Sequence, residues 1–156
     1  MWDLEFWVRL VSVVVGTVCF SVIFYVRPKH LPLAALGSAI TFVAYSLIIY
    51  LEMSLFAAGF ISTVAAALFA EVCARVCRAP ALVFLIPCLL PTVPGGDLYH
   101  AMSNFLAKNS TLGYEYLMSA LKISIGIAGG IVTVSLAVTL FYNLKKRRIG
   151  APKHDL

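Results

Sequence analysis

The stretch PCLLPTVPGGDLYH, residues 87–100, decides how this chain folds, because it interrupts a long apolar region with residues that break helices. It contains three prolines, two adjacent glycines, an aspartate and a histidine. Pro91 and Pro94 each lack the backbone N–H that a continuous helix needs. Gly95 and Gly96 permit unusual dihedral angles and the close approach of a ligand. The stretch therefore predicts a broken helix with polar residues at the break.

The composition of the whole chain is that of a membrane protein. Of its 156 residues, 62% are hydrophobic and only 12% are charged, and the mean hydropathy is +0.96. Soluble domains carry roughly 25% charged and 45–50% apolar residues. The first ten residues, MWDLEFWVRL, contain acids where a secretory signal would be basic, and the apolar run that follows is too long for a cleaved signal. We expect this first segment to remain as a membrane span.

The apolar segments predict an all-α integral membrane protein with five transmembrane helices, because one crossing takes about 20 apolar residues. The expected spans cover approximately residues 6–26, 31–51, 54–74, 80–107 and 117–142. The fourth span is expected to be discontinuous from Pro91 to Gly96, and residues 108–115 are expected to form a loop. Residues 1–156 would then be a single transmembrane domain, ending in a basic tail over residues 143–156.

Basic residues gather on one side of these five spans. That side receives Arg27, Lys29, Arg75, Arg78, Lys145, Lys146, Arg147, Arg148 and Lys153. The other side holds Arg9 at its margin and Lys108. The positive-inside rule places the basic side in the cytoplasm, with the N-terminus outside and the C-terminus inside. If residues 80–107 instead formed a re-entrant hairpin, the basic tail would lie outside, which the same rule disfavours.

The net charge of +5 mostly reflects this asymmetry. It favours anionic lipid headgroups as partners rather than nucleic acid. The four cysteines form no CxxC pair, and the chain has no HExxH motif, no phosphate loop and no paired nucleophile and base. The sequence therefore predicts no metal site, no cofactor and no enzyme activity.

The two halves of the fourth span fit one membrane crossing together. Helices over residues 81–90 and 97–107 would be about 15 Å and 16 Å long at 1.5 Å per residue, which matches a bilayer core of about 30 Å. The break would then lie near the midplane, where discontinuous helices form substrate sites in secondary transporters. The second half is expected to begin at Asp97, with free N–H groups that suit a substrate carboxylate.

The predicted substrate site consists of Pro94, Gly95, Gly96, Asp97, Tyr99 and His100. Asp97 has two possible roles, either as an N-cap for the second half-helix or as a proton carrier and partner for a substrate ammonium. His100, one turn later, could exchange a proton with Asp97 or be a satisfied histidine at a helix interface. Tyr99 could donate a hydrogen bond to substrate or simply pack.

Glu71 is the third candidate for proton coupling, after Asp97 and His100. Arg75 lies one turn further along the same predicted helix, so an ion pair near the interface is the alternative. Small residues recur at every fourth position of the third predicted span and predict close helix packing. They are Ala58, Ser62, Ala66, Ala70 and Ala74, with Gly126 and Gly130 in the last span.

The residues around the break resemble those of the small membrane subunit of the split threonine/serine exporter family. The resemblance rests on Pro87-x-x-x-Pro91-x-x-Pro94-Gly95, on Tyr99 four residues after that glycine, and on Ala101-Met102. It implies a small five-helix protein of a bacterial inner membrane that exports threonine, serine or related small carboxylates. It also implies a larger five-helix partner subunit and use of the proton gradient. Asp97 and His100 depart from the family pattern, which is expected to have small hydroxyl residues there.

The residues themselves indicate that this chain is one half of a transporter. Five helices with one break and no internal repeat lack the second half that inverted-repeat transporters contain. The predicted function is therefore a subunit of a secondary transporter for a small-molecule substrate. Two alternatives stay open, namely a homo-oligomeric channel and a scaffold or sensor subunit that does not transport.

Overall fold

Helices account for the regular structure of the chain. The computed structural model describes residues 4–149, and the side chains of residues 4–144, and no strand occurs within that range. The elements are α1 (Leu4–Ile23), η1 (Pro28–His30), α2 (Leu31–Tyr50), α3 (Leu55–Cys77), α4 (Leu82–Leu89), η2 (Leu90–Thr92), α5 (Gly95–Leu106) and α6 (Ser110–Ile149). Four of the described helices are long and apolar enough to cross a membrane, or five if α4–η2 and α5 count as one bent span. The predicted all-α membrane fold is confirmed.

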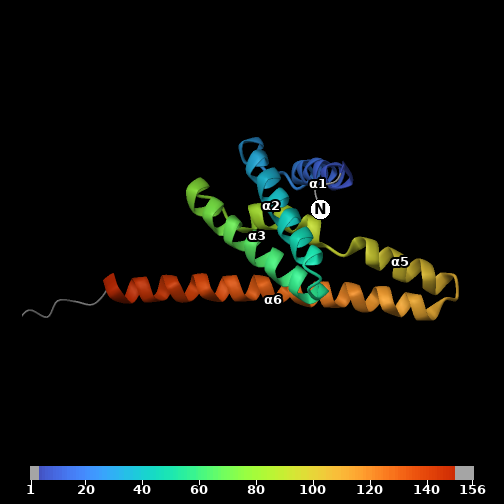
Figure 1. Ribbon diagram of the computed structural model, residues 1–156. Helices are drawn as coiled ribbons and strands as arrows, with labels where there is room; N and C mark the ends of the chain where they lie inside the picture. Colours follow the sequence, from blue (N-terminus) through green and yellow to red (C-terminus); the bar gives the residue numbers. More distant parts are fainter. Residues whose placement is uncertain (1–3, 150–156) are drawn as a thin grey trace, which may run out of the picture.

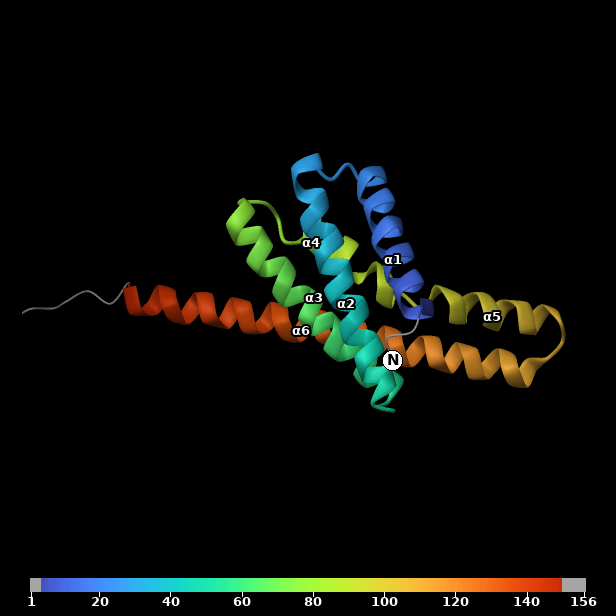
Figure 2. The ribbon, with the colours of Figure 1, turned by 45° about the horizontal axis from the view of Figure 1, so that its top comes forward.

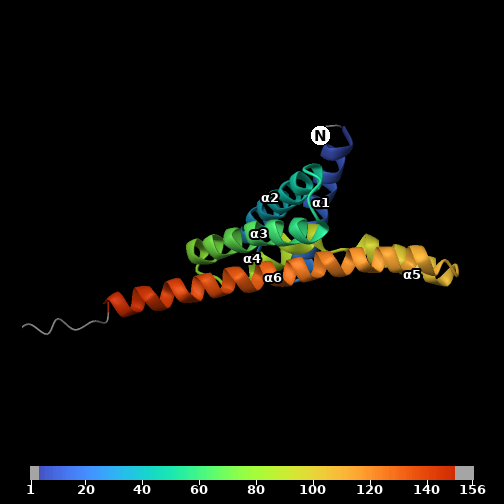
Figure 3. The same ribbon diagram turned by 60° about the horizontal axis from the view of Figure 1, so that its bottom comes forward.

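The helices form a group of α1 to α4 and a long rod made by α6 (Figure 1). Figure 2 shows α1 and α2 side by side, and α4 packs against α1, α2 and α3. The short α5 lies along the first part of α6 and extends away from the other helices (Figure 3). The core between α3 and α4 is built from Ala70, Cys73 and Phe84.

The predicted break in the fourth span is present, but it is shorter than expected. The pair formed by residues 82–92 and α5 is bent by 48°. Pro91 lies in the single 3₁₀ turn η2, so only Val93 and Pro94 separate the helical parts. Gly95 and Gly96 belong to the first turn of α5, and no glycine in the described chain has a positive φ. The two prolines therefore suffice to make the break, and the glycines are not needed for its backbone conformation.

The predicted loop over residues 108–115 is wrong, because α6 already begins at Ser110. Lys108 adopts a left-handed conformation with φ 61°, and the Asn109 side chain accepts a hydrogen bond of 3.5 Å from the backbone N–H of Leu112. Asn109 thus caps α6 immediately after a tight turn. Gly113 then allows α6 to pass closely over the ring of Phe105 on α5. At its other end α6 includes part of the predicted basic tail, and residues 150–156 lie outside the described residues.

Helices α3 and α6 approach closely at glycines, as the small-residue pattern predicts. A Cβ on Gly59 would lie 2.7 Å from the carbonyl oxygen of Ile123, and one on Gly126 would lie 2.5 Å from that of Phe56. Gly130 is equally close to α3, since its Cβ would lie 2.9 Å from the carbonyl oxygen of Phe60. Phe56 and Gly59 meet the turn of α6 from Ile123 to Gly126, whereas Thr63, further along α3, meets Gly130. The two helices therefore run parallel, as Figures 1 and 3 show.

Candidate functional site at the broken helix

The break lies among three helices of the bundle. The turn η2 packs against α1, α2 and α3, and Thr92 is buried there. Its hydroxyl donates a 2.8 Å hydrogen bond to the carbonyl oxygen of Leu89, which satisfies one of the acceptors that the break sets free. Irregular backbone at membrane depth is tolerated only where protein or a wet cavity surrounds it. The surroundings of η2 meet this condition.

The start of α5 presents free backbone donors to open space. Gly95 donates to the carbonyl oxygen of Val93 at 2.8 Å, and Leu98 donates to that of Pro94 at 3.1 Å. Between them, the N–H groups of Gly96 and Asp97 have no acceptor within the described residues. A Cβ on Gly95 or on Gly96 would meet no atom within 4 Å. Two free donors at the positive end of a helix, with room beside them, can hold an anionic group.

Asp97 does not cap α5, so that interpretation of the sequence is wrong. The N-cap residue is Pro94, no side chain makes a capping bond there, and Asp97 is the third residue of the helix. The chain enters the helix directly after Pro94, two residues earlier than predicted. Asp97 is partly buried, and its negative charge acts on the hydroxyl of Tyr45 on α2. The carboxylate is therefore free of a capping role.

His100 lies one turn after Asp97 on α5, next to the start of α6. Its ring is 5.2 Å from the ring of Tyr116 on α6 and 5.5 Å from that of Tyr99. Among the side chains that the structure describes, no hydrogen bond or ion pair joins His100 to Asp97. Tyr99 and His100 are both exposed. The structure thus brings Pro94, Gly95, Gly96 and Asp97 together at the break, while Tyr99 and His100 lie on the α5–α6 hairpin beside it.

Glu71 makes the ion pair that its spacing suggested. One of its carboxylate oxygens is 3.7 Å from a guanidinium nitrogen of Arg75, and the Glu71 side chain is 29% exposed. The pair lies in the last turns of α3, which ends at Cys77. Glu71 is therefore separate from the residues at the break.

Polar residues that the sequence did not single out also lie close to the break. A cavity of about 320 Å³ between α1 and α2 is lined by Tyr45 and Ser46 and by the ion pair of Glu5 with Arg9, whose atoms are 3.3 Å apart. Of the residues that line this cavity, Tyr45 lies within range of the Asp97 charge. Tyr45 could not be selected as a site residue from the sequence, because a lone tyrosine in an apolar helix most often packs against its neighbours.

Buried hydroxyl groups are a second feature that could not be predicted from the sequence. The buried hydroxyl residues are Thr17, Ser21, Ser38, Thr41, Ser62, Thr63 and Thr92. Most of these hydroxyls bond to a carbonyl oxygen on their own helix, but those of Thr17 and Thr63 have no partner. Thr17 lies on α1, which packs against α2, α4 and η2. A serine or threonine in a membrane helix is too common to mark such a role from sequence.

The fold and this site together define a class of protein. Several membrane-length helices and a broken helix that exposes backbone donors beside an acid are features of secondary transporters. The model of the threonine/serine exporter (ThrE) family matches residues 9–137, and the chain therefore belongs to that family. It is a multi-pass membrane protein with a transport role. Comparison with curated proteins and with solved structures gave no match.

Proposed function

We propose that this chain is a subunit of a secondary transporter that exports threonine, serine or related small carboxylates. The observation that supports this most is the open start of α5, where the N–H groups of Gly96 and Asp97 lack acceptors. A substrate carboxylate fits these donors and the positive end of the helix. The matching family and the membrane-length helices support the same function.

The other two groups of a hydroxylated amino acid have partners nearby. The carboxylate of Asp97 suits the substrate ammonium group, since the two opposite charges attract strongly at this depth. The hydroxyl of Tyr45, which lies within range of the Asp97 charge, suits the substrate hydroxyl. A site that hydrogen-bonds a substrate hydroxyl discriminates strongly against analogues without it, because its own polar groups are then left unpaired.

Proton coupling is part of this proposal, with Asp97, His100 and Glu71 as its candidates. Asp97 is the first choice, because it lies at the break and is not engaged as a cap. Glu71 is the weaker choice, since it is engaged in an ion pair with Arg75 away from the break. His100 lies between two tyrosine rings on the hairpin and could pass a proton between the site and the outer side.

The proposed topology places the N-terminus outside and the C-terminus in the cytoplasm of a bacterial inner membrane. The parallel contacts of α3 and α6 support five crossings, because both helices would then run from outside to inside. A re-entrant α4–α5 pair would give four crossings and an antiparallel α3 and α6. The charge asymmetry of the loops supports the same orientation.

A larger partner subunit is the second component of the proposed transporter. The chain has one broken helix, whereas inverted-repeat transporters bring two matching halves together around one site. The partner would supply the second half and close the open side of α5, although several copies of this chain could also assemble. Transport that needs the larger subunit and is absent with this chain alone would support the hetero-oligomer over a homo-oligomeric channel.

Transport by reconstituted protein tests the function directly. Proteoliposomes that contain this chain and its partner, with an imposed proton gradient, should move radiolabelled threonine against its concentration gradient. Asp97→Asn should abolish most of this movement while the protein stays in the membrane, because asparagine keeps the shape of the side chain but cannot carry a proton or a charge. Glu71→Gln is the matched control and should retain transport. Normal transport by Asp97→Asn with unchanged pH dependence would exclude Asp97 and make Glu71 the leading candidate.

A further inference from the structure

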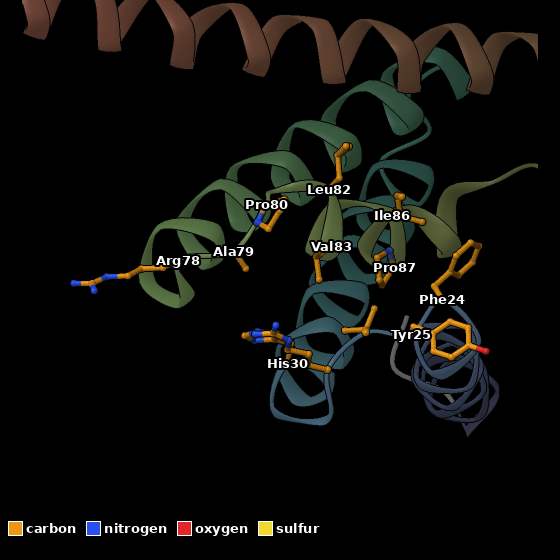
Figure 4. A pocket seen from close by; sticks show the side chains of 12 residues that line it. Phe24, Tyr25, His30, Arg78, Ala79, Pro80, Leu82, Val83, Ile86 and Pro87 are labelled. Atoms are coloured by element: carbon orange, nitrogen blue, oxygen red, sulfur yellow. The ribbon is translucent and has the colours of Figure 1, made fainter.

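A second cavity, of about 470 Å³, lies at the end of the molecule where α1 ends and α4 begins. Figure 4 shows Phe24 and Tyr25 at one end of it, His30 and Arg78 at the other, and Val83 of α4 between them. The volume is within the range of about 300–1,000 Å³ that small-molecule sites occupy. The cavity is separate from the start of α5 and has no part in the proposed export step.

The charged residues of this cavity are all basic. Arg27 and Arg78 line it, no aspartate or glutamate does, and neither arginine makes an ion pair among the described side chains. Arg78 reaches outward from the rim (Figure 4), which is the usual position of a long basic side chain at a membrane surface. The remaining wall is apolar, and Leu82 and Ile86 on α4 are exposed beside it. The cavity thus joins a cationic rim to an apolar surface.

His30 adds a polar atom that lacks a partner. The residue is only 4% exposed and its ring meets that of Phe84 edge-on, with the ring centres 5.2 Å apart. Its Nδ1 is buried and has no hydrogen-bond partner in the described chain. Such an atom costs free energy until an acceptor, a donor or a water reaches it. His30 also stands directly before α2, so the positive end of that helix is close by.

We propose that this cavity binds an anionic phospholipid of the cytoplasmic leaflet. The lipid phosphate lies between Arg27 and Arg78 and approaches His30, and the first acyl methylenes lie against Leu82 and Ile86. Basic pockets between membrane helices on the cytoplasmic side are suited to anionic headgroups. A free amino acid fits less well, because its ammonium group would meet two guanidinium groups and no acid. A free phosphate fits the rim but leaves the apolar wall uncovered.

Thermal unfolding of the purified full chain in neutral detergent tests the proposal. Added phosphatidylglycerol should raise the unfolding midpoint, whereas phosphatidylcholine should not. In the double variant Arg27→Gln/Arg78→Gln, the phosphatidylglycerol concentration that gives half the shift should rise about 20- to 30-fold, since each basic residue contributes roughly a fivefold change in affinity. The control Lys108→Gln/Lys122→Gln removes the same charge from exposed positions elsewhere and should respond like the wild type.

Three outcomes would overturn the lipid site. Equal loss of the response in both double variants would mean that the lipid acts through net charge alone. In a second outcome, glycerol phosphate or threonine raises the unfolding midpoint by the same amount as phosphatidylglycerol, and this shift is lost in Arg27→Gln/Arg78→Gln. That result would mean that the cavity binds a small anion or the substrate. If the arginine variant does not fold, native mass spectrometry of the wild type decides. Retention of phosphatidylglycerol over phosphatidylcholine supports the site, and equal retention of the two lipids rejects it.

Discussion

Two polar residues at helix starts, Ser54 and Asp97, act differently in this chain. The hydroxyl of Ser54 accepts a 3.2 Å hydrogen bond from the backbone N–H of Ala57 and caps α3, whereas the carboxylate of Asp97 caps nothing. A polar residue before an apolar run predicts a cap in both cases. Pro94 changes the outcome in the second case, because it starts α5 two residues before Asp97. The side chain of Asp97 is thereby left free for chemistry.

The difference predicts that alanine lowers stability more at Ser54 than at Asp97. Ser54→Ala should lower the free energy of unfolding by about 1 kcal/mol, because one N–H of the first turn loses its acceptor. Asp97→Ala should lower it by less, since only a favourable charge near the helix start is lost, worth about 0.3–1 kcal/mol. Unfolding of the purified variants in denaturing detergent measures both. A larger loss for Asp97→Ala than for Ser54→Ala would restore the capping role.

The two glycines of α5 should matter for access rather than for folding. Because a Cβ on Gly95 or Gly96 meets nothing within 4 Å, alanine at either position should leave stability unchanged or slightly higher. Gly96→Leu should abolish export, since its side chain fills the space beside the free N–H groups. Export assays on membranes with matched protein levels test this. Normal export by a well-expressed Gly95→Leu/Gly96→Leu double variant would exclude the start of α5 as the substrate site.

At the scale of elements, the contact of α3 with α6 is the most sensitive packing in the chain. Gly126 faces the carbonyl oxygen of Phe56, where a Cβ would lie at 2.5 Å, so Gly126→Ala must push the helices apart. Overpacking of this kind costs about 1–3 kcal/mol. Gly129 is the matched control, because its Cβ would meet only the Phe60 ring at an ordinary 3.4 Å. Gly129→Ala should be tolerated, and comparable destabilisation by both variants in a thermal unfolding assay would refute the proposed packing.

The sequence predicts the helices and the break well, because apolar length and proline act locally. The fourth predicted segment contains the bend between α4 and α5, and four of the five small residues named on α3 are buried, with Ala74 partly buried. Helix starts were less predictable. Asn109 and Ser110 looked like a loop, since the same residue types favour turns and caps.

The candidate site was only partly predictable for a different reason. Gly96 and Asp97 are recognisable from the local sequence, but Tyr45, which lies within range of the Asp97 charge, comes from a helix more than 50 residues away along the chain. Nothing in an apolar helix distinguishes a tyrosine that faces an acid from one that faces lipid. The cavity beside His30 depends in the same way on the ends of three helices meeting, which no single segment encodes.

At the scale of the whole molecule, the long helix α6 carries the information on topology. Its 40 residues pack first along α5 and then along α3, and the latter contact is parallel. The connection between two parallel neighbours must return across the membrane, and only α4–η2–α5 lies between them in sequence. The bent pair is therefore expected to form one full crossing, with the turn at Lys108 and Asn109 outside.

Reporter fusions at three positions test this arrangement. A reporter that is active only outside the cytoplasm should work before Met1 and within the turn after Lys108, and one that is active only inside should work after Leu156. The turn is the decisive position, because a re-entrant α4–α5 pair would place it in the cytoplasm and would reverse α6. The double variant Arg27→Gln/Arg78→Gln, which weakens the cytoplasmic charge bias, should leave the turn outside, because the basic residues after α6 still hold that end in the cytoplasm. A cytoplasmic turn together with an external C-terminus would reject the five-span topology and, with it, the position of Asp97 near the centre of the membrane.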